Sequence, residues 1–114
     1  SAADLVDESS VELLTDESKL QEGAKVYAAS CAVCHAADGG GTVGPNLTDE
    51  YWLHGGSISD VFKTIKYGVP EKGMISWQEE MGPAKMQAVA SYILSLQGTA
   101  PAAPKAPQGD KYVP

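Results

Sequence analysis

The chain has 114 residues, which is the length of one domain, and it carries 15 Asp and Glu against eight Lys and no Arg, for a formal charge of −7. This balance excludes a nucleic-acid-binding surface, which needs clustered Lys or Arg, and the apolar runs are too short to span a bilayer. Cys31 and Cys34 are only three positions apart and cannot link distant parts of the chain, so the fold is not built on disulfides.

The two ends of the chain differ in composition from its middle. Residues 1–15 are acidic and predict a flexible tail or linker. Residues 99–114 contain four of the seven prolines and predict an extended, flexible C-terminal tail. The folded domain is therefore expected over residues 16–98. Because the chain begins at Ser1, with neither Met nor a signal-like apolar stretch, we expect a processed product or an excised fragment.

Four segments show helical spacing of apolar residues or residues typical of helix ends. We expect helices over residues 16–32, 49–54, 58–67 and 83–98. Their starts are marked in turn by Thr15 or Asp16, by Thr48, by Ser57 and by Pro83. No segment alternates polar and apolar residues as strands do, so the predicted class is all-α.

The string Cys31-Ala-Val-Cys34-His35, at the end of the first predicted helix, indicates the chemistry. A thioredoxin-like redox pair needs a strand before the two cysteines, whereas a helix is predicted there. A structural zinc site needs four ligands, and only His35 and His54 are available beside the cysteines. The third interpretation is haem c, attached covalently through Cys31 and Cys34 with His35 as an axial ligand. The C-x-x-C-H pattern favours this third interpretation.

A haem also suits the small size of the predicted domain, since a buried haem would supply the apolar centre that so short a chain lacks. The candidates for the second axial ligand are Met74, Met81, Met86 and His54. Met86 is expected in the core, Met81 at the surface or in a hinge, and His54 at the end of a short helix. Met74 lies in a loop that can bring its thioether over a flat ring. We therefore predict ligation by His35 and Met74, which leaves no position for a substrate and favours electron transfer over catalysis.

Pro45 and Asn46 follow a glycine-rich loop and are the next expected members of the site. The carbonyl of Pro45 can accept a hydrogen bond from the second ring nitrogen of His35, which would fix the ring. The same two residues also suit a plain turn, and with a haem assigned we favour the role beside the haem. Aromatic side chains whose N–H or O–H can reach a haem propionate complete the expected surroundings, namely Tyr51, Trp52, Tyr67 and Trp77.

Together these residues resemble a class I cytochrome c. The marks are Gly23-x-x-x-Tyr27 before Cys31-x-x-Cys34-His35, then Gly44-Pro45-Asn46-Leu47, Gly73-Met74 and Val89-x-x-Tyr92-Ile93, and they cover residues 16–98. The resemblance implies four to five helices wrapped around one covalent haem c, with low-spin iron between His35 and Met74. It also implies that Gly23 lets the first and last helices cross closely, with Tyr27 and Tyr92 near the crossing.

A narrower resemblance covers residues 44–56, residues 65–77 and the tail after Leu96. These segments are similar to the C-terminal haem domain of the di-haem subunit of cbb-type haem–copper oxidases. In those subunits the domain lies on the periplasmic side and passes electrons to the oxidase. The resemblance implies an excised domain, whose membrane anchor and second haem domain belong to the parent chain. Two features depart from many members, because Ile75 replaces the Pro after the Met and no Arg is available for a propionate.

The expected function is that of a mono-haem c electron-transfer domain, not an enzyme. It would pass single electrons to a terminal haem–copper oxidase in an aerobic respiratory chain. A free-standing soluble carrier is the alternative, and a gas-binding or sensing haem domain is a further one. The expected donor is a quinol-oxidising complex or another cytochrome. The expected location of this monomer is the periplasmic side of the bacterial cytoplasmic membrane, either soluble or tethered through the parent subunit.

Overall fold

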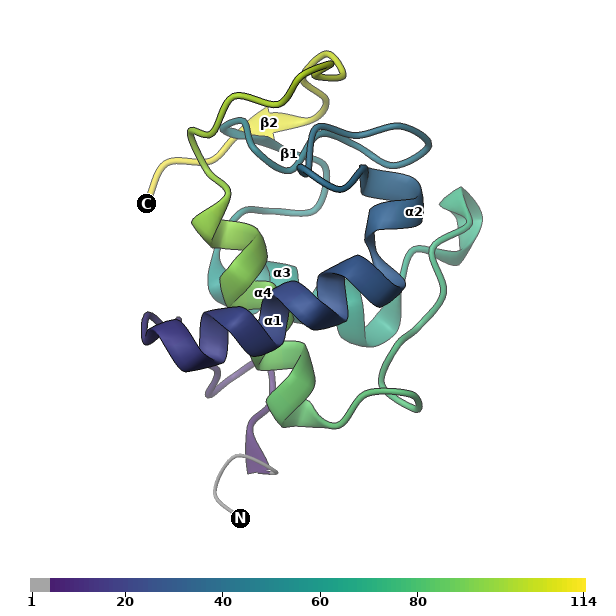
Figure 1. Cartoon of the computed structure of the whole chain (residues 1–114). Coiled ribbons are helices and arrows are strands. Elements are labelled where there is room, and N and C mark those ends of the chain that lie inside the picture. The colour runs from purple at the N-terminus through teal and green to yellow at the C-terminus, as the bar shows by residue number, and fades with distance from the viewer. Residues whose placement is uncertain (1–4) are drawn as a thin grey trace.

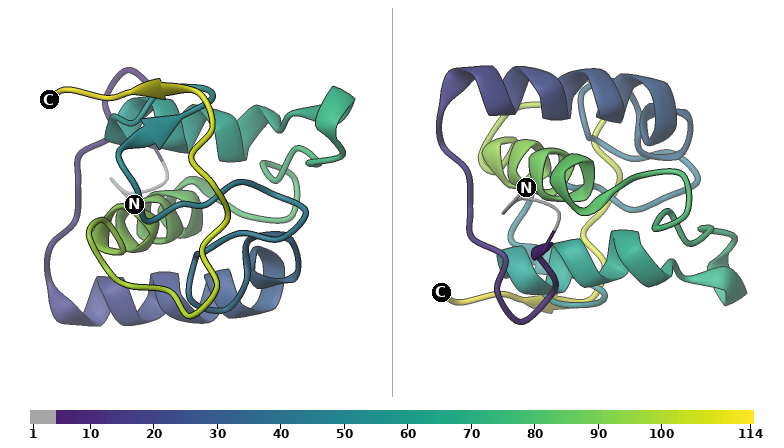
Figure 2. Two further views of the ribbon diagram at one scale, coloured as in Figure 1. Left: turned by 90° about the horizontal axis from the view of Figure 1, so that it is seen from above. Right: turned by 90° about the horizontal axis from the view of Figure 1, so that it is seen from below.

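The computed structural model describes residues 5–114 and shows helices connected by long loops (Figure 1). The elements are α1 Glu17–Ser30, α2 Ala32–His35, β1 Tyr51–Trp52, α3 Ile58–Tyr67, the 3-10 turn η2 Pro70–Lys72, α4 Pro83–Ser95 and β2 Asp110–Lys111. Figure 2 shows α4 lying between α1 and α3, and α4 packs against both. The core between these helices includes Tyr27, Phe62, Met86 and Val89. The predicted all-α class is confirmed, with one two-residue ladder added to it.

The crossing of α1 and α4 depends on Gly23. A Cβ at this position would overlap the backbone carbonyl of Ala88 and would lie 2.8 Å from Cβ of Tyr92. The two aromatic rings predicted near the crossing are in contact there, since the ring centroids of Tyr27 and Tyr92 are 5.5 Å apart. The absence of a side chain at Gly23 therefore sets the distance between the two helices.

Three of the four predicted helices are present with small shifts at their ends. Helix α3 has the expected bounds and begins with a capping box, in which the backbone N–H of Asp60 donates to the Ser57 hydroxyl and the Ser57 N–H donates to the Asp60 carboxylate. Helix α4 ends at Ser95 rather than at residue 98. Helix α1 ends at Ser30, and the residues after Cys31 form the separate turn α2. Among residues 5–114, we find no helix that combines the length and apolar character needed to cross a membrane.

The helix predicted over residues 49–54 is wrong, because this segment contains strand β1. The backbone N–H of Tyr51 donates to the Asp49 carboxylate, 3.0 Å away, in an Asx turn that competes with a helical start. Strand β1 then pairs antiparallel with β2, with Tyr51 opposite Lys111 and Trp52 opposite Asp110. Because the pairing partner lies far along the chain, local spacing gave no indication of it.

The described part of the acidic segment before α1 contacts α3 and α4. Val11 is buried in the core. The backbone N–H of Leu14 donates to the Ser91 hydroxyl at 2.9 Å, and the Gln87 amide donates to the backbone carbonyl of Glu12 at 2.9 Å. The Glu8 carboxylate pairs with Lys66 on α3 at 2.9 Å. The described part of this segment thus contacts the domain, while the domain boundary at residue 16 stays a prediction.

Substitution of Glu8 is expected to alter the pH dependence of stability. The hydrogen bond from Lys66 lowers the pKa of Glu8 from 4.5 to about 2. A carboxylate with a lowered folded pKa stabilises the fold above its unfolded pKa and loses this effect as the pH falls toward the folded pKa. Glu8→Gln should therefore lower the free energy of unfolding at pH 7, and the difference from the unsubstituted protein should shrink as the pH falls from about 4.5 to about 2.

Urea unfolding of both proteins at pH 7 and across the acidic range measures this difference. Glu79→Gln is the matched control, because Glu79 is exposed in the loop before α4. If the effect of Glu8→Gln were the same at pH 7 as at the acid end of the range, the assigned ion pair would be wrong.

Residues 99–112, which we call the C-terminal strap, lie on the domain rather than away from it. In Figure 2 (left) the strap runs from the end of α4 across the loops to β1. The backbone N–H of Ala102 donates to the Asp38 carboxylate at 3.1 Å, and that of Lys105 donates to the carbonyl of Gly40 at 2.8 Å. The strap has the extended form expected of a Pro-rich segment, but its polar groups bond to the domain. The boundary at residue 98 stays a prediction.

Candidate functional site

Turn α2 and the residue that precedes it, Cys31, place both cysteines and His35 within one turn of helix. The backbone N–H of His35 donates to the Cys31 carbonyl at 3.0 Å, and that of Cys34 reaches the same carbonyl at 3.2 Å. Cys31 is buried in the core, with 9 % of its surface exposed, whereas Cys34 is half-buried. Burial, with a smaller contribution from nearby Cys34, raises the pKa of the Cys31 thiol to about 11. Two thiols of the free chain thus lie one turn apart at the edge of the apolar core.

The imidazole of His35 is fixed in orientation by the loop that faces α2. Nδ1 of the ring lies 2.9 Å from the backbone carbonyl oxygen of Pro45, which is the contact expected from the sequence. Because a carbonyl oxygen only accepts, Nδ1 carries the proton and Nε2 remains available as a ligand atom. Burial lowers the pKa of His35, the bond to Pro45 opposes this shift, and the charge of Lys105 adds to it. The net effect favours the neutral ring, which is the form that binds metals.

The glycine-rich loop is tied to the carbonyl groups of α2. The backbone N–H groups of Thr42 and Gly44 donate to the Cys34 carbonyl at 3.1 and 2.7 Å, and that of Gly41 donates to the His35 carbonyl at 2.8 Å. On the other side, the Tyr27 hydroxyl donates to the carbonyl of Ala36 at 2.7 Å. These bonds satisfy the free carbonyl groups at the end of a short helix and fix the loop against the His35 ring.

Gly44 lies directly against the face of the His35 imidazole, and Gly44→Ala is expected to displace the ring. A Cβ at this position would lie 2.6 Å from Cε1 and 2.9 Å from Nδ1 of His35. Because the Gly44 N–H is bonded to α2, the loop cannot retreat without losing that bond. Overpacking of this kind costs about 1–3 kcal/mol.

We therefore expect Gly44→Ala to lower the free energy of unfolding by about 2 kcal/mol in denaturant titrations. The neighbouring Val43→Ala serves as the control, because Val43 is exposed and should leave both stability and the His35 ring unchanged. Equal stability of Gly44→Ala and Val43→Ala would show that the ring has room to move.

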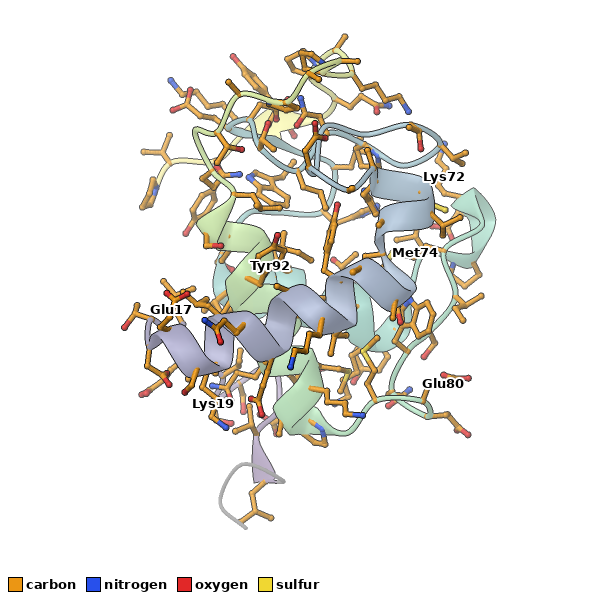
Figure 3. All side chains as sticks on the ribbon, viewed as in Figure 1. Glu17, Lys19, Lys72, Met74, Glu80 and Tyr92 are labelled. Atoms are coloured by element: carbon orange, nitrogen blue, oxygen red, sulfur yellow. The ribbon has the colours of Figure 1, made fainter. Side chains whose placement is uncertain are left out.

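Met74 lies on a short hairpin loop that is anchored to the end of α3. The backbone N–H groups of Val69 and Met74 each donate to the other's carbonyl, at 2.9 and 3.1 Å. The Ser76 hydroxyl donates to the carbonyl of Lys66 at 2.6 Å, and the Trp77 N–H donates to that of Ile65 at 3.1 Å. In all views this loop lies at the same end of the molecule as α2, and Figure 3 labels Met74 and Lys72 on it. The half-buried Met74 packs against the core cluster.

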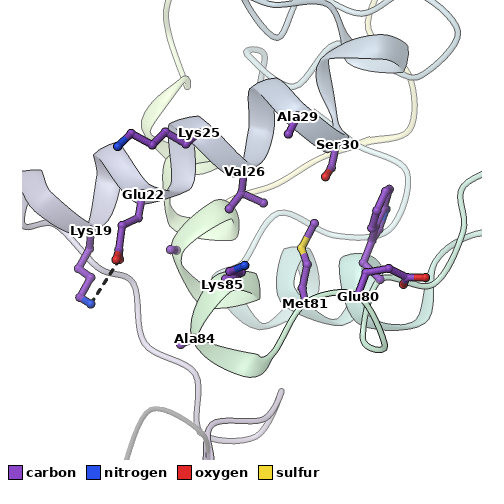
Figure 4. Close-up of a pocket in the computed structure, with 12 residues that line it drawn as sticks. Lys19, Glu22, Lys25, Val26, Ala29, Ser30, Glu80, Met81, Ala84 and Lys85 are labelled. Carbon is purple, nitrogen blue, oxygen red and sulfur yellow. Dashed lines mark ion pairs between the residues drawn. The ribbon is translucent and has the colours of Figure 1, made fainter.

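The other candidates for a second axial ligand occupy different environments. Met86 is buried in the core, as expected for a residue on the apolar face of α4. Met81 was predicted at the surface or in a hinge, which is wrong, because only 4 % of it is exposed. Figure 4 shows Met81 pointing toward α1, in a groove of about 470 Å³ that Val26 and Trp77 also line. His54 is exposed beyond β1 rather than at a helix end.

The remaining predicted site residues are spread between the loop and the rim of the core. The Asn46 side chain is committed within the protein, since its oxygen accepts from the N–H and hydroxyl of Thr48 at 2.8 and 2.7 Å and its amide donates to the Lys105 carbonyl at 3.1 Å. Trp52 and Trp77 pack against the core cluster. Tyr51 and Tyr67 are exposed, and Lys66 lies 5.1 Å from the centroid of the Tyr67 ring.

The structure adds three residues to the surroundings of His35 that the sequence pattern had not assigned to the site. Tyr27 bonds to the turn after His35, Gly44 contacts the ring, and Nζ of Lys105 donates to the carbonyl of Val43 at 3.2 Å. The glycine preceding Pro45 was a usable indication of close contact. The residues around Lys105 in the sequence gave no indication that it lies near His35, because the strap brings it to the loop from a distant part of the chain.

The donor set at this end of the molecule fits a haem c. It comprises two thiols one helical turn apart, an imidazole whose Nε2 is free, and a thioether on an anchored loop. A structural zinc site would need four ligands. In the part of the chain from Leu5 onward, no three His, Cys, Asp or Glu side chains are grouped so that they could bind a metal ion.

Comparison with known proteins identifies relatives of this chain. The family described as cytochrome c oxidase, cbb3-type, subunit III matches residues 18–93. The cbb3-type cytochrome c oxidase subunit CcoP of Rhodobacter capsulatus is 40% identical over 95 residues, which cover 73% of this chain and 31% of the relative. Subunit FixP of Azorhizobium caulinodans is 38% identical over 88 residues, covering 70% of this chain and 30% of that protein. The chain thus spans about a third of these relatives' length.

Two solved structures with a similar fold are cytochromes. Cytochrome cL of Methylophaga aminisulfidivorans superposes with a TM-score of 0.68 at 21% identity, over 73% of this chain and 56% of the other. Cytochrome cL of Hyphomicrobium denitrificans gives a TM-score of 0.64 at 31% identity, over 69% of this chain and 48% of the other. The first likeness shows the fold, which is that of a class I cytochrome c. Since the family match covers more than half of its residues, the chain belongs to the cbb3-type cytochrome c oxidase subunit III family.

Proposed function

We propose that the chain is a mono-haem c electron-transfer domain that passes single electrons to a terminal haem–copper oxidase. The observation that carries this proposal is the geometry of α2. Both cysteines lie on the same turn as His35, and the bond from Nδ1 to Pro45 leaves Nε2 free to bind a metal. A thiol pair and an oriented imidazole at this spacing match what covalent haem attachment requires.

In this proposal each residue of the site has a distinct role. Cys31 and Cys34 form the thioether bonds, and Nε2 of His35 and the thioether of Met74 are the axial ligands of a low-spin iron. A haem bound in this way supplies a one-electron couple, and a thioether ligand raises its potential relative to a second imidazole. Pro45 orients His35, and Asn46 holds the loop to the strap. Trp52, Tyr67 and Trp77 are proposed to surround the haem.

Membership of the family supports the assignment to a respiratory chain. Relatives at about 40% identity are named as subunits of cbb3-type oxidases, and the matched part is 31% of one and 27% of another. We propose that this domain accepts electrons from a quinol-oxidising complex or another cytochrome and works as a monomer. Its proposed place is the periplasmic side of the membrane. In this role the domain transfers electrons and performs no reaction of its own on a substrate.

Mass spectrometry under denaturing conditions, combined with a redox titration, tests the proposal. The protein matured with its haem should keep one haem after unfolding, and a Cys31→Ser/Cys34→Ser double variant should lose it. The matured protein should also titrate reversibly as a single one-electron couple. A haem that dissociates on unfolding, or the absence of a reversible couple, would contradict the proposed function.

A further inference from the structure

The C-terminal strap places one lysine at the loop that fixes His35. The backbone N–H of Lys105 donates to the carbonyl of Gly40 at 2.8 Å, and its backbone carbonyl accepts from the Asn46 amide at 3.1 Å. Both partners belong to the loop that contacts the imidazole. Lys105 is therefore fixed to this loop by its main chain, whatever its side chain does.

The side chain of Lys105 adds a positive charge at the same place. Its ammonium group donates to the carbonyl of Val43 at 3.2 Å, and Val43 directly precedes the glycine that lies against the His35 ring. Residue 105 is half-buried, although this hydrogen bond lies at the surface, so solvent screens the charge without removing its effect on the loop.

We propose that Lys105 raises the reduction potential of the iron bound by His35. A fixed positive charge near a redox centre disfavours the oxidised state, which carries one more positive charge than the reduced state. In this proposal Lys105 contacts neither the iron nor its ligands. It acts only through the electrostatic effect of its charge on the iron. The inference rests on the proposed function, since it requires an iron bound at His35.

The strap lies beyond the residues that the family model matches. The family match ends at residue 93, whereas the strap begins at residue 99. Two glycines of the domain lie closely against the strap, and one glycine of the strap lies closely against the domain. A Cβ at Gly40 would lie 2.7 Å from Cβ of Pro101, one at Gly56 would lie 2.8 Å from Cβ of Tyr112, and Gly109 passes against the backbone of Trp52. Lys105 is thus a charge that the strap brings to the loop beside His35.

Midpoint potentials of the haem-loaded protein and a charge series at position 105 test the proposal. Lys105→Gln should shift the one-electron equilibrium about threefold toward the oxidised form. This shift corresponds to a midpoint potential that is about 28 mV lower. Lys105→Glu should shift it in the same direction by about twice as many millivolts, and Lys105→Arg should leave it unchanged. Lys111→Gln is the matched control, because Lys111 is an exposed lysine of the same strap that pairs with Glu50.

Urea unfolding of each variant separates charge from structure. The main-chain hydrogen bonds of residue 105 survive a side-chain change. The free energy of unfolding should therefore not depend on the charge at position 105, whereas the midpoint potential should. Equal potentials for Lys105→Gln, Lys105→Glu and the unsubstituted protein, with a reversible couple present, would overturn the role of Lys105 alone. If the unsubstituted protein showed no reversible haem couple, both this inference and the proposed function would be overturned.

Discussion

Gly23→Ala is expected to lower the free energy of unfolding by about 3 kcal/mol or more, the upper end of the range for overpacking. In an open helix the same substitution would stabilise by about 1 kcal/mol, because Ala has the higher helix propensity. At the α1–α4 crossing the added Cβ would overlap the Ala88 carbonyl and would lie 2.8 Å from Cβ of Tyr92. The obstacle is backbone, so the helices must separate and their buried contacts must loosen.

Guanidinium unfolding of the haem-loaded protein measures the effect, with Gly82→Ala as the control. Gly82 has a φ of −71°, and a Cβ there would meet nothing within 4 Å, so Ala should be tolerated. A Gly23→Ala protein as stable as Gly82→Ala would show that α1 and α4 do not cross in the way that the structure shows.

Met74→Ala is expected to remove the second axial ligand of the iron. The oxidised protein should lose the charge-transfer absorption typical of methionine bound to haem iron, its potential should fall, and the reduced protein should gain rapid binding of carbon monoxide. The hairpin of residues 69–74 should persist, because its two hydrogen bonds are between backbone groups. The spectral change should therefore exceed any change in stability.

Met81→Ala should show the opposite pattern. Met81 is buried in the core, so its truncation should cost about 2–5 kcal/mol in unfolding free energy. Its thioether points toward α1 in the groove of Figure 4, and the charge-transfer absorption should remain. Loss of that absorption in Met81→Ala but not in Met74→Ala would reverse the proposed assignment of the ligand.

The elements set by nearby residues could be predicted from the sequence. Helix α3 has the expected bounds because Ser57 caps its start and Gly68, with a φ of 71°, follows its end. The contact between His35 and Pro45 was also predictable, because the partners are ten residues apart and only a small set of groups can bond to the second nitrogen of an axial histidine.

Features that depend on distant parts of the chain could not be predicted in this way. Strand β1 replaced a predicted helix because its partner is β2, near the C-terminus. The burial of Met81 depends on how α1 passes over the loop before α4, which spacing within one segment does not reveal. The position of Lys105 follows from its hydrogen bonds to Gly40 and Asn46. Nothing in the sequence around these two residues indicates that the strap bonds to them.

Electron transfer by a six-coordinate haem can be tested with the absorption spectrum of the reduced, haem-loaded protein, recorded at neutral pH before and after addition of carbon monoxide. We expect a low-spin haem c spectrum that carbon monoxide leaves unchanged, because His35 and Met74 are proposed to occupy both axial positions of an iron that only transfers electrons. A rapid change of the spectrum on addition of carbon monoxide would show an open axial position and would contradict electron transfer as the function of this domain.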